Sequence, residues 1–288
     1  MRVSNKLMAD NILANLRRQT NQLLETQTRI LTGKVINKPS DDPIGMGKVL
    51  DYRQTLASID QFDINITNGK SRIEYTENIL DSVHDLVSDA KRIAADNNPD
   101  SQGALAQEVE DIRSQILQLA NSMYDGTYIF SGDATDTKPF DSSGTYVGSP
   151  TGGTKEFMIA PNVEVSVQAD GSDIFQGVED VFTVMDDLKT ALQAGDETAI
   201  ANQIKPLQDV LDHLELTRSD NAAKYRRLEM SEAHWSSFKI GIQNLLSKTE
   251  DADMAAEVIN LQIQQASYQT SLATSAKIVQ PTLMQFLS

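Results

Sequence analysis

The run VINLQIQQASYQTSLATSA, residues 258–276, contains no charged side chain over nineteen consecutive positions. A helix of that length could span a bilayer. However, amide and hydroxyl side chains recur throughout, as at Gln264-Gln265 and Thr274-Ser275, and inserting so many polar groups into lipid is unfavourable. The run therefore predicts a helix that other protein surfaces shield on most sides.

The same segment carries a regular stripe of apolar and small residues, spaced alternately by four and three positions from Met254 to Phe286. A stripe with the same spacing runs from Ala9 through Thr20 and Gln27 to Ile30 near the other end of the chain. Such stripes are typical of coiled-coil seams. Because Thr, Gln and Ser interrupt both stripes, we expect the two ends to pair with each other and to contact further helices as well. The expected assembly interface comprises Leu13, Leu16, Leu23, Ile30, Val258, Leu261, Tyr268, Leu272 and Val279.

Helical spacing of apolar residues also fills most of the middle of the chain. The boundaries between helices are marked as well. Gly33 is typical of a helix C-terminus, and Asp42-Pro43 is typical of an N-cap followed by the first helical residue. Asp125-Gly126 is expected to end a further helix. The stripes run over residues 59–87, 105–123, 181–191 and 207–248.

One stretch, residues 127–175, departs from the helical pattern because it is rich in Gly, Pro and weak helix formers. Val163–Ala169 alternates as a half-buried strand does, and Lys155–Ala160 precedes it across a Pro161-Asn162 turn. The sequence therefore predicts a mainly α fold, a long coiled-coil-like helical bundle with paired N- and C-terminal helices and a small inserted antiparallel β domain. The expected domains are residues 1–42 with 250–288 for terminal assembly, 43–132 with 176–249 for the bundle, and 133–175 for the β insert.

The composition excludes several classes of site and partner. The chain has no Cys and three His, so disulfides, Cys-ligated metals and Cys nucleophiles are excluded and a His-rich metal site is not expected. The net charge is −16, with the acidic excess in the middle of the chain, whereas nucleic-acid binding needs a basic face. Neither nucleic acid nor a membrane is an expected partner, and the N-terminus lacks the apolar core of a signal peptide.

Short motifs offer chemical interpretations, but each has a more ordinary one. A phosphate-binding loop needs Lys directly after its last Gly, and in Gly148–Lys155 (GSPTGGTK) Thr154 intervenes, which favours a hairpin turn. Asp41-Asp42 could be paired catalytic carboxylates or a cation site, but the flanking prolines favour a cap and a turn. The Asp residues between 133 and 173 lack the spacing of an EF-hand calcium loop. No catalytic, cofactor-binding or metal-ligating residue is therefore expected.

Both ends and the centre of the chain carry recognisable signatures. Leu31–Pro43 reads LTGKVINKPSDDP, and Glu250–Glu257 (EDADMAAE) is followed by Leu261–Leu272 (LQIQQASYQTSL). Between them lie Tyr128–Gly132 (YIFSG) and Thr135–Phe140 (TDTKPF). The two ends resemble the bacterial flagellin family, and the central segments resemble the hook-associated members of that family more than its filament subunits.

The resemblance implies a structural, non-enzymatic component of the bacterial flagellum that joins the hook to the filament. In that family the paired termini form the inner layer of a tube, the long helices form the next layer, and the β insert points outward. The implied partners are the neighbouring hook-associated protein, flagellin, further copies of the chain and a flagellar export chaperone. The implied location is extracellular, after export through the flagellar secretion apparatus without a cleaved signal. Filament flagellin itself, an enzyme with a helical scaffold and a β cap, and a coiled-coil tip protein of a related secretion system stay open as alternatives.

Overall fold

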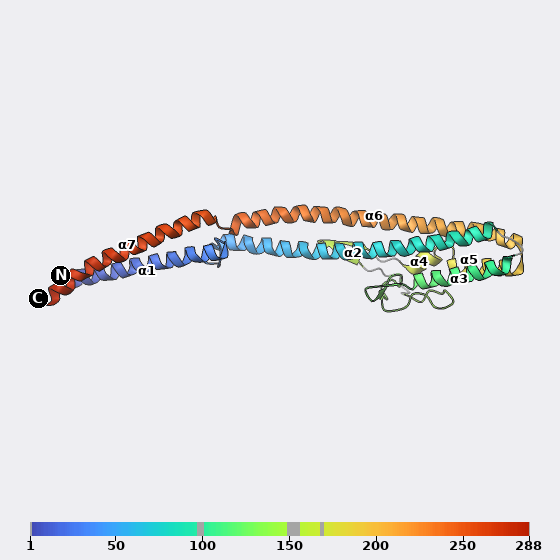
Figure 1. Ribbon diagram of the computed structural model, residues 1–288, viewed down its shortest axis with the longest axis horizontal. Coiled ribbons are helices and arrows are strands. Elements are labelled where there is room, and N and C mark those ends of the chain that lie inside the picture. The colour runs from blue at the N-terminus through green and yellow to red at the C-terminus, as the bar shows by residue number, and fades with distance from the viewer. Residues whose placement is uncertain (1, 97–100, 149–155, 168–169, 288) are drawn as a thin grey trace. The chain divides into compact units, whose positions relative to one another are not determined.

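The computed structural model describes residues 2–96, 101–148, 156–167 and 170–287, and it describes side chains within these ranges from Leu7 to Ala276 (Figure 1). The near match to a phosphate-binding loop falls mostly on residues 149–155, outside the described residues. The helices are α1 (Arg2–Thr32), α2 (Pro43–Ala95), α3 (Gln102–Ala120), α4 (Gly171–Gln176), α5 (Val181–Ala194), α6 (Glu197–Glu250) and α7 (Met254–Leu287). The strands are β1 (Met123–Tyr124), β2 (Thr127–Tyr128), β3 (Glu156–Ala160) and β4 (Val163–Ser166).

The chain forms two compact units. One unit comprises Met1–Ser58 with Phe238–Ser288, and the other comprises Ile59–Ser237. The long helices α2 and α6 each contribute residues to both units. The mainly helical fold with a small antiparallel β element is confirmed, whereas the finer division into three domains stays a prediction.

The predicted helix boundaries follow from local chemistry. Helix α1 ends at Thr32, and Gly33 adopts a φ of 70°, which a residue without Cβ tolerates best. Asp42 caps α2, because its Oδ1 accepts hydrogen bonds from the backbone N–H groups of Ile44 (3.1 Å) and Gly45 (2.9 Å). Pro43 is the first helical residue of α2, where its missing N–H leaves no donor unsatisfied.

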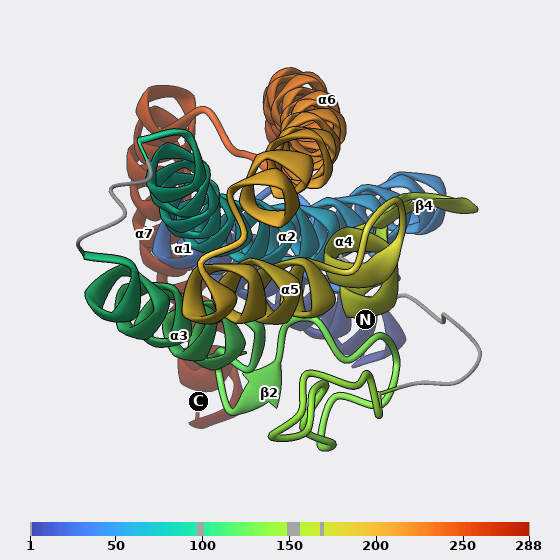
Figure 2. The same cartoon turned by 90° about the vertical axis from the view of Figure 1, so that its right-hand side faces the viewer.

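The core of the Ile59–Ser237 unit lies among α2, α3, α5 and α6, and Figure 2 shows α3 and α5 beside each other. Each of these helices turns an apolar face inward at helical spacing, as the stripes predict. Fully buried examples are Val83 on α2, Val109 on α3, Leu188 on α5 and Leu207 on α6. Burying these faces supplies the main driving force for folding of this unit.

A cluster of aromatic rings closes one part of this core. Phe140 contacts three rings, with centroid distances of 5.4 Å to Phe175, 5.3 Å to Phe182 and 5.3 Å to Tyr146. Phe130 meets Phe175 edge to face at 5.3 Å. The chain has few aromatic residues, but it concentrates several of them where the non-helical segment 127–147 meets the helices. These rings therefore hold that segment to the bundle.

The predicted β hairpin is present. Strands β3 and β4 pair antiparallel, with Phe157 opposite Val165, and Asn162 in the connecting turn has a φ of 59°. Val165 and Ile159 are buried against Ile66 and Leu228 in a second, smaller core. The strict alternation of residues 163–167 thus reports a strand with one face on the helices.

A second hairpin corrects the expectation that a helix continues to Asp125-Gly126. Helix α3 ends at Ala120, and β1 pairs antiparallel with β2. Asp125 and Gly126 form the two-residue turn, with φ values of 49° and 72°. Positive φ at both positions is the requirement of the type I′ turn that matches the twist of paired strands, and Asp-Gly is among its preferred sequences. The apolar spacing up to Met123 therefore overstated the length of the helix.

Candidate functional site: the terminal helices and their junction

The two ends of the chain pair as antiparallel helices. Figure 1 shows α1 and α7 side by side. Near one end of the pair, Arg29 lies 3.5 Å from the carboxylate of Glu257, and further along, Gln19 Nε2 donates to Ser271 Oγ at 3.0 Å. The predicted pairing of the termini is therefore confirmed. The contact is partly polar, because Gln, Ser and Thr alternate with the apolar residues along it.

The structure divides the nine predicted interface residues between two faces of the helix pair. Five of them are half-buried between α1 and α7, namely Leu16, Leu23, Ile30, Leu261 and Tyr268. Three are exposed: Leu13 at 52%, Val258 at 42% and Leu272 at 42%. The side chain of Val279 lies outside the described residues. The role of all nine residues in assembly stays a prediction.

The pairing face is offset by one residue from part of the predicted seam. Leu16, Leu23 and Ile30 belong both to the predicted seam and to the pairing face. Between them on α1, Gln19 and Thr26 are shielded from solvent, whereas Thr20 and Gln27 of the predicted seam are exposed. On α7 the corresponding half-buried residues are Gln264 and Ser271. A 3.6-residue helix drifts relative to a seven-residue repeat, so one stripe of apolar residues can serve two adjacent faces. The large apolar residues of the two helices that stay exposed are Leu7, Met8, Leu13, Leu24, Leu31, Met254, Val258, Ile259, Ile263 and Leu272.

The two connectors that join the terminal helices to α2 and α6 pair with each other. Lys34 and Asp251 form an antiparallel β-bridge. The backbone N–H of Val35 donates to the carbonyl of Glu250 at 2.7 Å, and the N–H of Ala252 donates to the carbonyl of Gly33 at 2.8 Å. The connectors are therefore ordered by backbone hydrogen bonds and are not independent tethers.

A buried carboxylate fixes this junction. Glu250, the last residue of α6, is 5% exposed, and its two oxygens hold two cations. Lys34 Nζ lies 2.8 Å from Oε1, and Arg53 on α2 lies 2.6 Å from Oε2. One side chain thus ties together the first connector, α2 and α6. The sequence does not reveal this clamp, because its members are separated by about two hundred residues.

Replacing Glu250 by Gln is expected to loosen the junction locally. The amide keeps the shape of the side chain but leaves Lys34 and Arg53 without a counter-charge. Since both cations are partly solvated, the expected local destabilisation is about 1–2 kcal/mol. Hydrogen exchange at the amides of Val35 and Ala252 should therefore speed up roughly tenfold.

The matched control is Glu215→Gln, which removes an exposed carboxylate 3.7 Å from His84 elsewhere on α6. That variant should leave exchange at the two connector amides unchanged. Equal exchange rates in the Glu250→Gln protein and the unmodified chain would show that the clamp contributes nothing to the junction.

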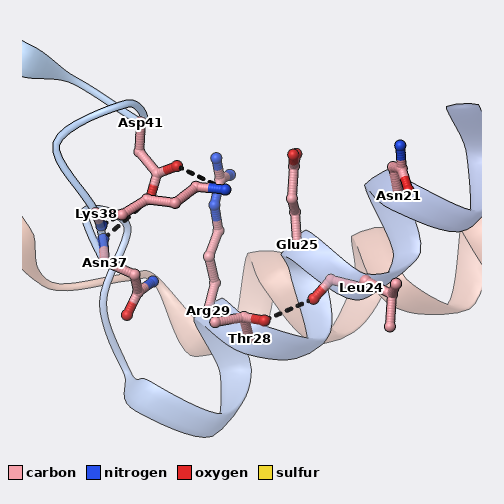
Figure 3. Close-up of a pocket in the computed structure, with 8 residues that line it drawn as sticks. All are labelled: Asn21, Leu24, Glu25, Thr28, Arg29, Asn37, Lys38 and Asp41. Atoms are coloured by element: carbon pink, nitrogen blue, oxygen red, sulfur yellow. Dashed lines mark hydrogen bonds and ion pairs between the residues drawn. The ribbon is translucent and has the colours of Figure 1, made fainter.

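A polar cavity of about 360 Å³ lies between α1 and the first connector (Figure 3). Asp41 Oδ2 accepts hydrogen bonds from the backbone N–H groups of Asn37 and Lys38, each at 3.1 Å. Partial desolvation opposes ionisation of Asp41, but these hydrogen bonds and the charges of Lys38 and Arg29 outweigh it, so its pKa lies below the ordinary value. The residues that line the cavity are Asn21, Leu24, Glu25, Thr28, Arg29, Asn37, Lys38 and Asp41.

The two adjacent carboxylates of this connector have structural roles. Asp41 closes the turn at Asn37-Lys38, and Asp42 caps α2. Both therefore accept backbone hydrogen bonds, as the cap-and-turn interpretation predicts. Across the described ranges, three or more His, Asp or Glu side chains nowhere gather in an arrangement that could hold a metal ion.

The three histidines likewise occupy structural positions. His84 lies 3.7 Å from Glu215, and His213 Nε2 lies 2.8 Å from the backbone carbonyl of Asp173. The His234 ring packs edge to face on Trp235, with a centroid distance of 5.3 Å. Each His therefore meets a different neighbour, and the structure does not bring them together.

Among the described residues, no helix contains an apolar run long enough to cross a membrane.

Comparison with known proteins agrees with this arrangement. The sequence matches the bacterial flagellin N-terminal helical region over residues 3–135. It is 24% identical to flagellar hook-associated protein 3 of Salmonella typhimurium, over 99% of each chain. It is also 24% identical to the protein of the same name from Escherichia coli, over 94% of this chain and 95% of that one.

A solved structure shares the fold. The crystal structure of FlgL from Bacillus cereus superposes with a TM-score of 0.61 and 22% identity, covering 68% of this chain and 99% of that chain. The match of the N-terminal helical region, the similarity over nearly the full length and the shared fold all agree with a resemblance to the flagellin family. Residues 3–135 thus match the bacterial flagellin N-terminal helical region, and the resemblance of the chain to the flagellin family is confirmed.

Proposed function

We propose that this chain is a structural component of the bacterial flagellum that joins the hook to the filament. The main support is similarity over nearly the whole length of proteins named flagellar hook-associated protein 3. Filament flagellin is the alternative, since it would share the N-terminal helical region. The central YIFSG and TDTKPF segments resemble the hook-associated members of the family more than its filament subunits, which is why the junction role is preferred.

The observation on the molecule that carries the proposal is the two-faced pair of terminal helices. One face of α1 and α7 holds the helices together, and beside it Leu13, Leu272 and Ile263 stay exposed. Apolar side chains exposed along a paired helix favour association with further helices. Because α7 has no charge between Val258 and Ala276, such packing would desolvate no ion along that stretch.

The wider assignment follows from the same proposal. Copies associate head to tail in a tube, a heterologous contact that does not close on itself. Residues 1–42 with 250–288 form the inner layer, 43–132 with 176–249 the next layer, and 133–175 the outward insert. The partners are the neighbouring hook-associated protein, flagellin, further copies and an export chaperone. The protein has no catalytic role. It is exported through the flagellar secretion apparatus and lies outside the cell.

A strain lacking the gene tests the proposal. Cells should retain hooks of normal length, lack filaments and release monomeric flagellin into the medium, and the full chain supplied in trans should restore filaments. Hooks without filaments and without flagellin in the medium would identify the chain as the filament subunit instead. Normal filaments on the deletion strain would refute both assignments.

A further inference from the structure

Arg72 on α2 is a buried cation without a carboxylate partner in the described part of the chain. Its residue exposure is 3%. Its guanidinium donates two hydrogen bonds to neutral acceptors, to Thr127 Oγ1 and to the Tyr128 carbonyl, both at 3.2 Å. Its third nitrogen, Nε, is buried and has no hydrogen-bond partner among the described residues. Among the described residues, the positive charge of Arg72 is therefore not balanced by a carboxylate, and its Nε–H group lacks an acceptor.

The Arg72 side chain also lines a cavity. A space of about 160 Å³ is lined by Asn68, Arg72, Tyr124, Asp125, Thr127 and Phe157. That volume is roughly that of five water molecules in the liquid, taking about 30 Å³ for each, and suits a carboxylate or a tetrahedral oxyanion. The cavity lies within the Ile59–Ser237 unit, where α2 meets the β1–β2 hairpin.

An unpaired buried guanidinium is unfavourable. Burial lowers the pKa of Arg72, and the nearby Tyr124 opposes that shift. Because a guanidinium stays protonated in proteins, an incoming anion would relieve the imbalance, whereas loss of the proton would not be available. Planar guanidinium groups bind carboxylates and phosphates with two parallel hydrogen bonds, which makes Arg the usual residue at such sites.

We propose that this cavity binds a small oxyanion, either a carboxylate or a phosphate-type group, through Arg72. The side-chain amide of Asn68 on the cavity wall supplies a second donor type. The anion is either free in the medium or a carboxylate presented by a neighbouring copy of the chain. Binding to the isolated chain does not depend on the flagellar role proposed above, so the two can fail separately.

Asp125 provides the rival explanation. It lines the same cavity and sits in the hairpin turn with a φ of 49°. Its carboxylate would repel a bound anion, or it could itself swing onto Arg72 and neutralise it. The two explanations predict opposite effects for Asp125→Asn, and Asn is well tolerated at positive φ, so the turn is kept.

Thermal unfolding of the purified full-length chain tests the site, with inorganic phosphate, sulfate and acetate compared with chloride at equal ionic strength. Sulfate and phosphate also stabilise proteins without binding a site, so the readout is the difference between the unmodified chain and Arg72→Met. The unmodified chain should gain about 3–5 °C more than Arg72→Met in tens of millimolar phosphate. If Arg72→Met does not fold, Arg72→Lys replaces it, and we expect its affinity to fall about tenfold.

Asp125→Asn should bind phosphate several-fold more tightly than the unmodified chain. Equal shifts in the unmodified chain and Arg72→Met, or a destabilised Asp125→Asn protein indifferent to anions, would overturn the proposal. Assembly in vitro identifies the source of the anion. Inhibition of assembly by millimolar acetate or phosphate supports a carboxylate from a neighbouring copy, and unaffected assembly supports a free anion.

Discussion

Replacing Leu272 by Asp should abolish incorporation of the chain into flagella, and with it motility, while the monomer stays folded. Leu272 lies on α7 and is 42% exposed, beside the face of the helix that packs on α1. In the monomer the carboxylate remains hydrated, so unfolding temperatures should change by less than about 1 °C. In a closed helical layer the same carboxylate would be buried without a partner, which is a severe penalty. Swimming plates and electron microscopy measure the loss.

Two matched variants separate assembly from folding. Val178→Asp places the same charge at an exposed apolar position after α4 and should leave motility intact. Leu261→Asp introduces it between α1 and α7 and should disturb the helix pair in the monomer itself, seen as faster hydrogen exchange at both ends of the chain. Normal swimming of Leu272→Asp cells would show that this face of α7 is not an assembly surface.

Replacing Phe140 by Ala should severely destabilise the Ile59–Ser237 unit. Phe140 is fully buried and contacts the rings of Phe175, Phe182 and Tyr146. Truncation removes its burial and leaves a cavity among side chains that cannot collapse onto it, which costs about 3–5 kcal/mol. For a unit of this size the unfolding temperature should fall by about 10 °C in calorimetry.

The control is Met230→Ala, which truncates an apolar side chain of the same unit that is 68% exposed. That change should cost less than about 1 kcal/mol, because most of the side chain already contacts solvent. A similar small effect at Phe140 would mean that the aromatic cluster tolerates the cavity and does not hold the 127–147 segment to the bundle.

Pairing of the termini could be predicted from the sequence because it depends on spacing alone. The face used by each helix could not, since Leu16, Leu23 and Ile30 fit two adjacent seams equally well. Only contact with the partner helix decides whether Gln19 or Thr20 turns inward. The predicted end of the helix beyond Met123 was wrong for a related reason, because an apolar residue at helical spacing can also be the start of a strand.

The electrostatic features were beyond the reach of sequence patterns. Glu250 meets Lys34 and Arg53 only through the fold, and nothing in their local sequence distinguishes them from solvated charges. Arg72 is still less visible, because an Arg on a helix is usually exposed and its burial depends on a hairpin more than fifty residues away. Local caps such as Asp42, by contrast, act within three residues and were predicted correctly.

The two connectors differ in length, and this gives the junction a mechanical asymmetry. Gly33–Asp42 spans ten residues between α1 and α2, whereas Asp251–Asp253 spans three between α6 and α7. Fully extended, they would reach roughly 35 Å and 10 Å at about 3.3–3.6 Å per residue. Under an axial load that breaks the backbone hydrogen bonds between the connectors, the short connector would become taut first, and the long one, folded around Asp41, would still hold slack. Tension on the terminal helices would then be borne by the α6–α7 path before the α1–α2 path is stretched.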